Sequence, residues 1–217
     1  MVRVVAILGD YYHPSGRAKE SLERALVSSI TKEVIQIDYC SHDQIKEKLS
    51  LQPDAVILFK ENRLNPIEVQ EEKWMSEDLA AEITKYVSNG GGFLAWHSGL
   101  ASFPPESTFT KMLRGHFLYH PEKHQLVHYR STTENPILAQ PISFEVLDEH
   151  YFVHCEEDNT NIFLSSESID GKQAAGWFHT FGEGKVCCLT PCHNRDGLLK
   201  QEFVKLLGSC VNWIVSK

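Results

Sequence analysis

A run of glycines, five apolar residues and a His-Ser-Gly sequence constrain the fold of this chain more than any other stretch. Residues 89–100 read NGGGFLAWHSGL, so a helical pattern stops at the glycines and a buried strand follows. His97 and Ser98 come directly after the apolar run, where that strand should end. In an open α/β sheet, ligands bind outside the carboxyl ends of the strands. We therefore expect His97 and Ser98 to lie at the rim of a binding crevice.

Strand and helix patterns alternate through the first half of the chain. We expect strands over residues 2–8, 33–39 and 54–59, helices over residues 17–30 and 42–49, and a further helix that begins after Ser76 and stops at Gly90. Residues 60–74 are polar and contain Pro66, which indicates an irregular loop over the active edge. The alternation predicts a mostly parallel sheet with right-handed crossovers and helices on both faces.

The second half reads mainly as successive strands. Strand patterns cover residues 124–130, 161–166, 172–179 and 185–190, an alternating stretch covers 144–154, and helical patterns cover 107–114 and 201–215. The sequence FGEG at 181–184 is typical of a hairpin turn, so strands there should be antiparallel. Because no repeat or linker separates the two halves, we expect a single α/β domain over residues 1–217.

Charge, length and cysteine usage exclude several classes of partner. A net charge of −8 argues against nucleic acid, since phosphate binding needs clustered Lys and Arg. No apolar run approaches the roughly 20 residues of a membrane span, and the chain starts on a strand rather than a signal peptide. The six cysteines form no C-x-x-C pair, as expected of free thiols in a reducing compartment. These features predict a cytoplasmic protein that binds small molecules. They do not decide whether the protein is a monomer or a homo-oligomer.

Other polar residues also follow strand patterns. His13 lies in the loop after the first strand and should project toward the same edge as His97, unless it is a plain surface histidine. His193 follows a later apolar strand in the same way. Glu149 belongs to an acidic pair that interrupts an alternating strand, where it could be a general base, a metal ligand, a partner that fixes a histidine tautomer, or a solvated edge charge.

His116 and His120 are spaced four residues apart. On a helix, this spacing could form a metal-binding pair. Gly115 before and Pro121 after them argue against a helix, so the spacing alone does not indicate a metal site.

Several segments along the chain together resemble a known family. They are GGGFLAWHSG at 90–99, FTKMLRGHF at 109–117, DEHY at 148–151, Trp177, GEGKV at 182–186 and the pair Cys192-His193. Their order and spacing resemble ThuA-like proteins, which are associated with trehalose and related sugar utilisation and belong to the class I glutamine amidotransferase-like superfamily. The resemblance covers essentially the whole chain. It implies a flavodoxin-like, mostly parallel sheet with an added antiparallel portion.

The resemblance also bears on mechanism. In true amidotransferases the strand-to-helix elbow carries a cysteine nucleophile, which a histidine from a later loop activates. Here His97 matches the elbow position and His193 the later histidine, so we do not expect glutamine hydrolysis by a thiolate. Cys192 as a displaced nucleophile, or Ser98 with His193 as its base, remain alternatives.

Family position implies a pocket formed by four strand ends. The candidate catalytic residues are His97, His193, Glu149 and Ser98, and the candidate substrate-binding residues are His13, His120, Tyr151 and Trp177. A histidine-rich set with one carboxylate suits either proton transfer near neutral pH or a divalent metal such as Zn²⁺. The ring of Tyr151 or Trp177 could stack on a sugar, or each of them, like His120, could be structural.

We expect an enzyme of carbohydrate metabolism, a hydrolase or an isomerase, that acts on a sugar or an oxidised sugar derivative. The competing hypothesis is a non-catalytic sugar-binding or regulatory protein that kept the crevice but not the cysteine. A third hypothesis is that the chain is a subunit that functions only together with a partner protein. The substrate, the reaction and the metal stay open at this point.

Overall fold

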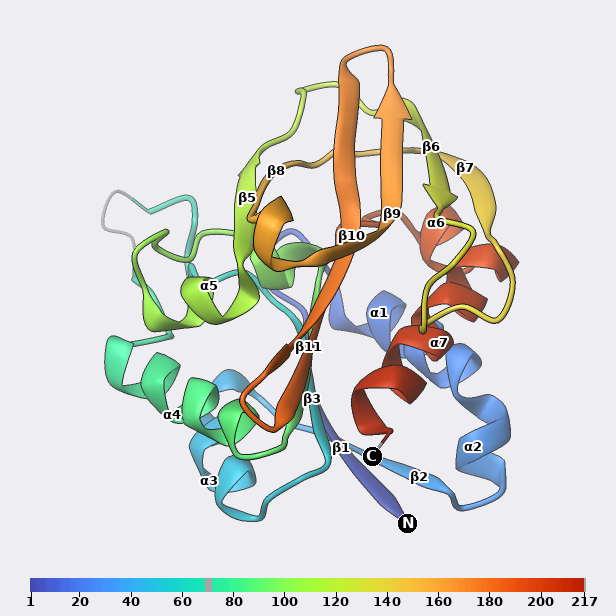
Figure 1. Ribbon diagram of the computed structural model, residues 1–217. Coiled ribbons are helices and arrows are strands. Elements are labelled where there is room, and N and C mark those ends of the chain that lie inside the picture. The colour runs from blue at the N-terminus through green and yellow to red at the C-terminus, as the bar shows by residue number, and fades with distance from the viewer. Residues whose placement is uncertain (69–71, 217) are drawn as a thin grey trace.

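The computed structural model describes residues 1–68 and 72–216, and a nine-stranded sheet lies at its centre (Figure 1). The sheet order is β2 (Ile35–Tyr39), β1 (Val2–Leu8), β3 (Ala55–Phe59), β4 (Gly92–Trp96), β11 (Gly184–Leu189), β10 (Gly171–Phe181), β9 (Asn161–Ser168), β6 (Gln125–Ser131) and β7 (Ser143–Asp148). The first five strands pair in parallel and the remaining pairs are antiparallel. A separate antiparallel pair consists of β5 (Gly115–Tyr119) and β8 (Phe152–Cys155). The predicted parallel sheet with an added antiparallel portion is confirmed.

Helices cover both faces of the parallel half. They are α1 (Ser15–Ala25), α2 (Val27–Thr31), α3 (Ile45–Ser50), α4 (Glu77–Ser88), α5 (Thr108–Leu113), α6 (Arg195–Leu198) and α7 (Gln201–Val215), with single 3₁₀ turns η1 (His42–Gln44), η2 (His97–Leu100) and η3 (Glu157–Asn159). In Figure 1, α1, α2 and α7 lie on one side of the sheet and α3, α4 and α5 on the other. The helix expected over residues 17–30 is interrupted at Leu26, where α1 ends and α2 begins.

Successive side chains of a parallel strand point to opposite faces of the sheet, so the apolar residues are divided between two cores. In β1, Val4 and Ala6 belong to the core under α1 and α7, whereas Val5 and Ile7 belong to the core under α3 and α4. Strands β3 and β4 are buried along their whole length, which explains their continuous apolar sequences.

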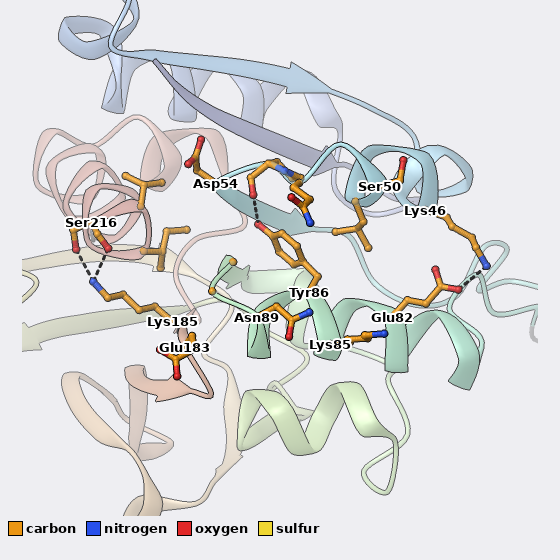
Figure 2. Close-up of a pocket in the computed structure, with 17 residues that line it drawn as sticks. Lys46, Ser50, Asp54, Glu82, Lys85, Tyr86, Asn89, Glu183, Lys185 and Ser216 are labelled. Carbon is orange, nitrogen blue, oxygen red and sulfur yellow. Dashed lines mark hydrogen bonds and ion pairs between the residues drawn. The ribbon is translucent and has the colours of Figure 1, made fainter.

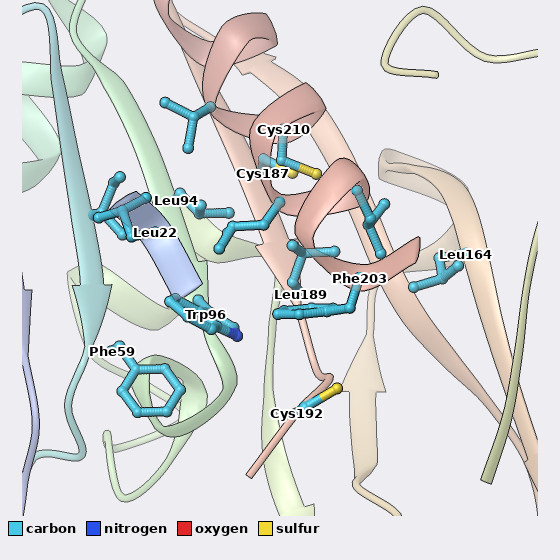
Figure 3. Packing of buried hydrophobic residues seen from close by; sticks show 14 of the residues in the cluster. Leu22, Phe59, Leu94, Trp96, Leu164, Cys187, Leu189, Cys192, Phe203 and Cys210 are labelled. Atoms are coloured by element: carbon cyan, nitrogen blue, oxygen red, sulfur yellow. The ribbon is translucent and has the colours of Figure 1, made fainter. Parts of the chain in front are cut away.

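Aromatic rings fill the first core directly beneath the carboxyl ends of β3 and β4. Figure 3 shows Trp96 between Phe59 and Phe203, with ring centroids 4.4 Å and 5.8 Å away respectively. The indole Nε1–H of Trp96 donates to the carbonyl of Pro191 at 2.6 Å, which joins the end of β4 to the segment after β11. The backbone at the end of β4, directly before His97, is therefore held in place by aromatic packing and by this hydrogen bond.

The alternating stretch over 144–154 forms two strands in two different sheets. β7 ends at Asp148 in the large sheet, and β8 begins at Phe152 beside β5. Glu149 and Tyr151 lie in the connection between them, so the acidic pair marks the point where the chain changes sheets.

Two further expectations can be compared with the fold. Residues 60–68 and 72–74 are irregular apart from a bridge between Arg63 and Lys73, whereas residues 69–71 of that predicted loop lie outside the described residues. No helix within residues 1–68 and 72–216 is long and apolar enough to cross a membrane.

The N-cap of α4 provides a test of local stability. Because the Ser76 hydroxyl accepts the Leu79 N–H at 3.2 Å, we expect Ser76→Ala to lower the free energy of unfolding by about 1 kcal/mol, measured by urea denaturation. Ser28→Ala, at an exposed position of α2, is the control and should not destabilise the protein. Equal stability of the Ser76 variant and the wild type would contradict the cap.

Candidate functional site

The chain leaves β4 through a strained elbow. His97 is fully buried and has a φ of 50°, a left-handed conformation that is uncommon for a residue with a side chain. Gly99 permits this turn because a Cβ there would collide with the carbonyl oxygen of Leu58. Such strain persists where the surrounding structure enforces it, and it is concentrated at functional sites.

A backbone carbonyl fixes the ring of His97. Its Nδ1 lies 2.7 Å from the carbonyl oxygen of Thr190, at the end of the neighbouring strand β11. Because a carbonyl only accepts, Nδ1 carries the proton and donates it, and Nε2 keeps a free lone pair. Tyr151 packs against the ring, with centroids 4.1 Å apart and planes inclined by 23°.

Asp10 holds His13 in a similar way at the end of β1. The Asp10 carboxylate lies 2.6 Å from Nδ1 of His13 and also accepts the backbone N–H groups of Tyr12, His13 and Glu61. Burial alone would raise the pKa of Asp10, but the hydrogen bond and charge of His13 lower it to about 2. The ionised carboxylate makes Nδ1 the protonated nitrogen, so Nε2 of His13 is free to bind a ligand.

The structure brings His13, His97, Glu149 and His193 together from the ends of β1, β4, β7 and β11. One potential ligand atom from each lies within 4.8 Å of all the others. Glu149 oxygens are 3.5 Å from Nε2 of His97 and 3.3 Å from Nδ1 of His193. The ring of His13 lies 5.0 Å from that of His97 and 4.7 Å from that of His193, centroid to centroid.

The cluster has the dimensions of a metal site. Nε2 of His13, Nε2 of His97 and Nδ1 of His193 are buried without a hydrogen-bond partner among the described residues, an uncommon condition for polar atoms. A tetrahedral ion with ligands at about 2.0–2.1 Å holds those ligands roughly 3.3 Å apart. The separations of 3.5 Å from Glu149 to His97 and 3.3 Å from Glu149 to His193 agree with this value, and all four ligand atoms lie within 4.8 Å of one another. The four residues therefore fit a divalent cation such as Zn²⁺, which binds to histidine nitrogens and carboxylate oxygens.

The electrostatics around Glu149 distinguish the two neighbouring histidines. Burial would raise the pKa of Glu149, but the nearby imidazoles of His193 and His97 hold it far below its usual range. Complete burial lowers the pKa of His97. For the partly exposed His193, burial would lower the pKa, but the nearby Glu149 carboxylate outweighs burial and raises it. An ionised Glu149 next to a neutral His97 is the state in which both can bind a cation.

Two other predicted residues lie close to the cluster in different positions. His120 is partly exposed, with Nε2 3.7 Å from a Glu149 oxygen and Nδ1 2.8 Å from the carbonyl of Pro121. Ser98 is fully buried, and its hydroxyl helps to lower the pKa of Asp10. A hydroxyl in that position is not exposed to a substrate.

The expectation that Tyr151 or Trp177 stacks on a sugar was wrong. Trp177 is fully buried in the second core, and its Nε1–H donates to the carbonyl of Leu113 at 2.8 Å. Tyr151 is also buried, and its ring lies between those of His97 and Phe117. Both rings fill the interior, and only Tyr151 contacts the cluster.

The cysteines contribute no nucleophile to this cluster. All six thiols are free, as the sequence predicted. Burial raises the pKa of Cys192 well above its ordinary value, and this side chain is only 1% exposed. A thiolate at Cys192 is therefore strongly disfavoured.

Asp10 and Thr190 support the cluster but were not among the predicted site residues. The spacing of Asp10 three residues before His13 in a turn-rich loop was the available signal, because aspartate in such loops accepts nearby backbone N–H groups. The role of Thr190 rests on its carbonyl, which no sequence pattern reveals.

A cavity that does not include the histidines lies at the opposite end of the sheet (Figure 2). It measures about 720 Å³, and its walls include Lys46, Asp54, Glu82, Tyr86 and Lys185. These residues lie at or near the amino ends of β3, β4 and β11 and on α3 and α4, whereas the histidines follow carboxyl ends. Because parallel α/β sheets bind ligands at carboxyl ends, we assign the chemistry to the histidine cluster and not to this cavity.

Comparisons with known proteins agree with this fold. A family model described as ThuA, trehalose utilisation, matches residues 4–214. Similar solved structures include a ThuA-like protein from Parabacteroides merdae (TM-score 0.74, 13% identity, 99% of this chain and 90% of that chain) and one from Bacteroides uniformis (0.72, 16%, 100% and 92%). A cytoplasmic protein from Salmonella typhimurium LT2 is also similar (0.63, 16%, 98% and 99%). At these identities the structural matches show the fold alone. A search of curated proteins gave no match.

The low pKa of Asp10 predicts how acid affects the metal-free protein. Because the folded pKa of about 2 lies below that of an unfolded aspartate, Asp10 contributes stability that is present above about pH 4 and is lost as the pH falls toward 2. We expect Asp10→Asn to lower the free energy of unfolding by about 2 kcal/mol at pH 7, and by progressively less between pH 4 and 2. Urea denaturation across this range measures the difference. A difference that did not change with pH would contradict the assignment.

Proposed function

The chain belongs to the ThuA family, described as trehalose utilisation, and from this premise we propose that it is a metal-dependent enzyme acting on a sugar or an oxidised sugar derivative. The observation that carries the proposal is the group of three buried, unpartnered imidazole nitrogens that face the Glu149 carboxylate. Three such nitrogens in one place are costly to bury, because an unsatisfied buried polar group costs about 1–3 kcal/mol, and a bound cation would satisfy all three at once.

Four residues have the donor chemistry to hold the metal. His13 and His97 would offer Nε2, His193 would offer Nδ1, and Glu149 a carboxylate oxygen. A divalent ion such as Zn²⁺ bound there would polarise a carbonyl or hydroxyl oxygen of the sugar. Asp10 and the Thr190 carbonyl orient two of the rings, so the Nε2 lone pairs of His13 and His97 would be available to such an ion.

His120 is the residue best placed to move a proton. Its Nδ1 donates to the Pro121 carbonyl, which leaves the lone pair on Nε2, close to Glu149. The side chain is 35% exposed, so a bound sugar can reach it while the four clustered side chains remain largely buried. We assign His120 the proton transfer to or from a sugar hydroxyl or carbon. This role replaces the substrate-binding role that the sequence suggested.

The elbow separates this chemistry from that of an amidotransferase. His97 occupies the position at which a cysteine nucleophile would stand, and the neighbouring Ser98 is fully buried. A hydrolase or isomerase reaction without a covalent enzyme intermediate fits these residues best. Free cysteines and small-molecule chemistry fit a cytoplasmic setting, as does the description of the Salmonella neighbour.

Metal content tests the proposal directly. We expect about one divalent ion per chain in wild-type protein purified without an affinity tag, and loss of that ion in His97→Ala and Glu149→Ala, measured by elemental analysis. His128→Ala is the matched control, because His128 is exposed and pairs with Glu145 away from the cluster. That variant should keep the metal.

Folding and turnover complete this test. The His97 and Glu149 variants should retain wild-type circular dichroism and lose turnover of the sugar substrate. Wild-type protein that binds no divalent ion would refute the metal-dependent enzyme. Binding of a sugar without turnover, unchanged after chelation, would instead support a non-catalytic sugar-binding protein.

A further inference from the structure

We propose that Asp148 is a positioning residue that fixes Glu149 and His193 relative to each other; this inference rests on the proposed metal site. Asp148 is fully buried at the end of β7, directly before Glu149. In the sequence, Asp148 is marked only as the neighbour of Glu149 in an acidic pair. Its hydrogen bonds give it a separate role from that of Glu149.

Both oxygens of the Asp148 carboxylate accept backbone N–H groups. Oδ2 accepts the N–H of His193 at 2.8 Å and that of Asn194 at 3.1 Å, and Oδ1 accepts the N–H of Glu149 at 2.9 Å. One side chain therefore binds the backbone of two potential metal ligands that are 44 positions apart in the chain. Hydrogen bonds to a charged acceptor are stronger than those between neutral groups.

The two segments have no sheet ladder between them. β7 is an edge strand, and β10, β9 and β6 separate it from β11. Their ends nevertheless meet, because the Asp148 carboxylate at the end of β7 accepts the backbone N–H groups of His193 and Asn194 after β11. Besides Asp148, an exposed bond from the Asn194 side-chain amide to the Leu147 carbonyl, at 3.4 Å, joins them.

The surroundings of Asp148 leave little freedom of position. A Cβ added at Gly197 would lie 3.2 Å from Asp148 Oδ2 and 2.9 Å from Cys192 Cβ, so α6 packs closely on the carboxylate. An asparagine in this place has one oxygen instead of two. At least one of the N–H groups would then face the NH₂ group and lose its acceptor.

The first measurement uses wild-type protein without metal. We expect the amide hydrogens of Glu149 and His193 to exchange at least tenfold more slowly than those of exposed loops, although both residues lie outside helices and strands. In Asp148→Asn these amides should exchange at least tenfold faster than in the wild type. Fast exchange in the wild-type protein would overturn the proposal, even if the variant failed to fold.

The second measurement is Zn²⁺ affinity by competition with a chromogenic chelator. We expect Asp148→Asn to bind Zn²⁺ roughly 10- to 100-fold more weakly, as is typical when a residue that orients a ligand is lost. Two controls should keep the wild-type affinity: Glu145→Gln on the exposed face of β7, and Ser76→Ala, which destabilises the fold away from the site.

The outcomes separate this inference from the proposed function. Zn²⁺ affinity of Asp148→Asn within twofold of the controls would overturn the positioning role. If the wild-type protein bound no Zn²⁺, the proposed function would fail, and amide exchange would decide alone whether Asp148 fixes the two segments. Weaker Zn²⁺ binding in Ser76→Ala as well would show that lost stability explains the effect and would also overturn the positioning role.

Discussion

The candidate site depends on the hydrogen bond from Nδ1 of His97 to the carbonyl of Thr190. Because β4 and β11 are parallel neighbours, their ends meet, and a carbonyl of one can fix a ring on the other. This bond selects the tautomer whose Nε2 faces the cluster. It also makes burial of the ring tolerable, since one nitrogen is satisfied inside the protein and the other is available for a ligand. The positive φ of His97 contributes by directing the ring across the strand ends.

Two buried aspartates extend this support to the other three residues. Asp10 orients the ring of His13, and Asp148 holds the backbone of Glu149 and of His193. Both accept several backbone N–H groups, which compensate for the loss of water around a buried carboxylate. Together with Glu149, which belongs to the cluster, these two aspartates place three buried or mostly buried carboxyl groups in or beside it, and such a concentration of acidic groups favours a divalent cation there.

The sequence predicts the fold better than it predicts the site. The elbow was recognisable because glycines, a buried strand and a histidine occur in immediate succession, and the parallel half follows from the same alternation. The positions of His13, His97, Glu149 and His193 near one another could be anticipated because all four follow strands. Trp177 could not be placed, because an aromatic residue in a predicted strand has no sequence mark that distinguishes a core position from a pocket wall. Tyr151 shows the same difficulty, since its burial depends on contact with Phe117 from another sheet.

The antiparallel half explains how the flavodoxin-like half acquires a fourth side chain for its site. The parallel strands β1, β4 and β11 deliver three histidines to one edge, and the Asp10 carboxylate at the end of β1 is already bonded to Nδ1 of His13, so a carboxylate ligand comes from another strand. The added antiparallel strands bring the end of β7 to the loop after β11. At that point the chain leaves the large sheet and enters the two-stranded sheet as β8. Glu149 lies at that change of direction. The same extension places Tyr151 against His97 and His120 beside Glu149. The antiparallel strands therefore complete both the ligand set and the wall around it.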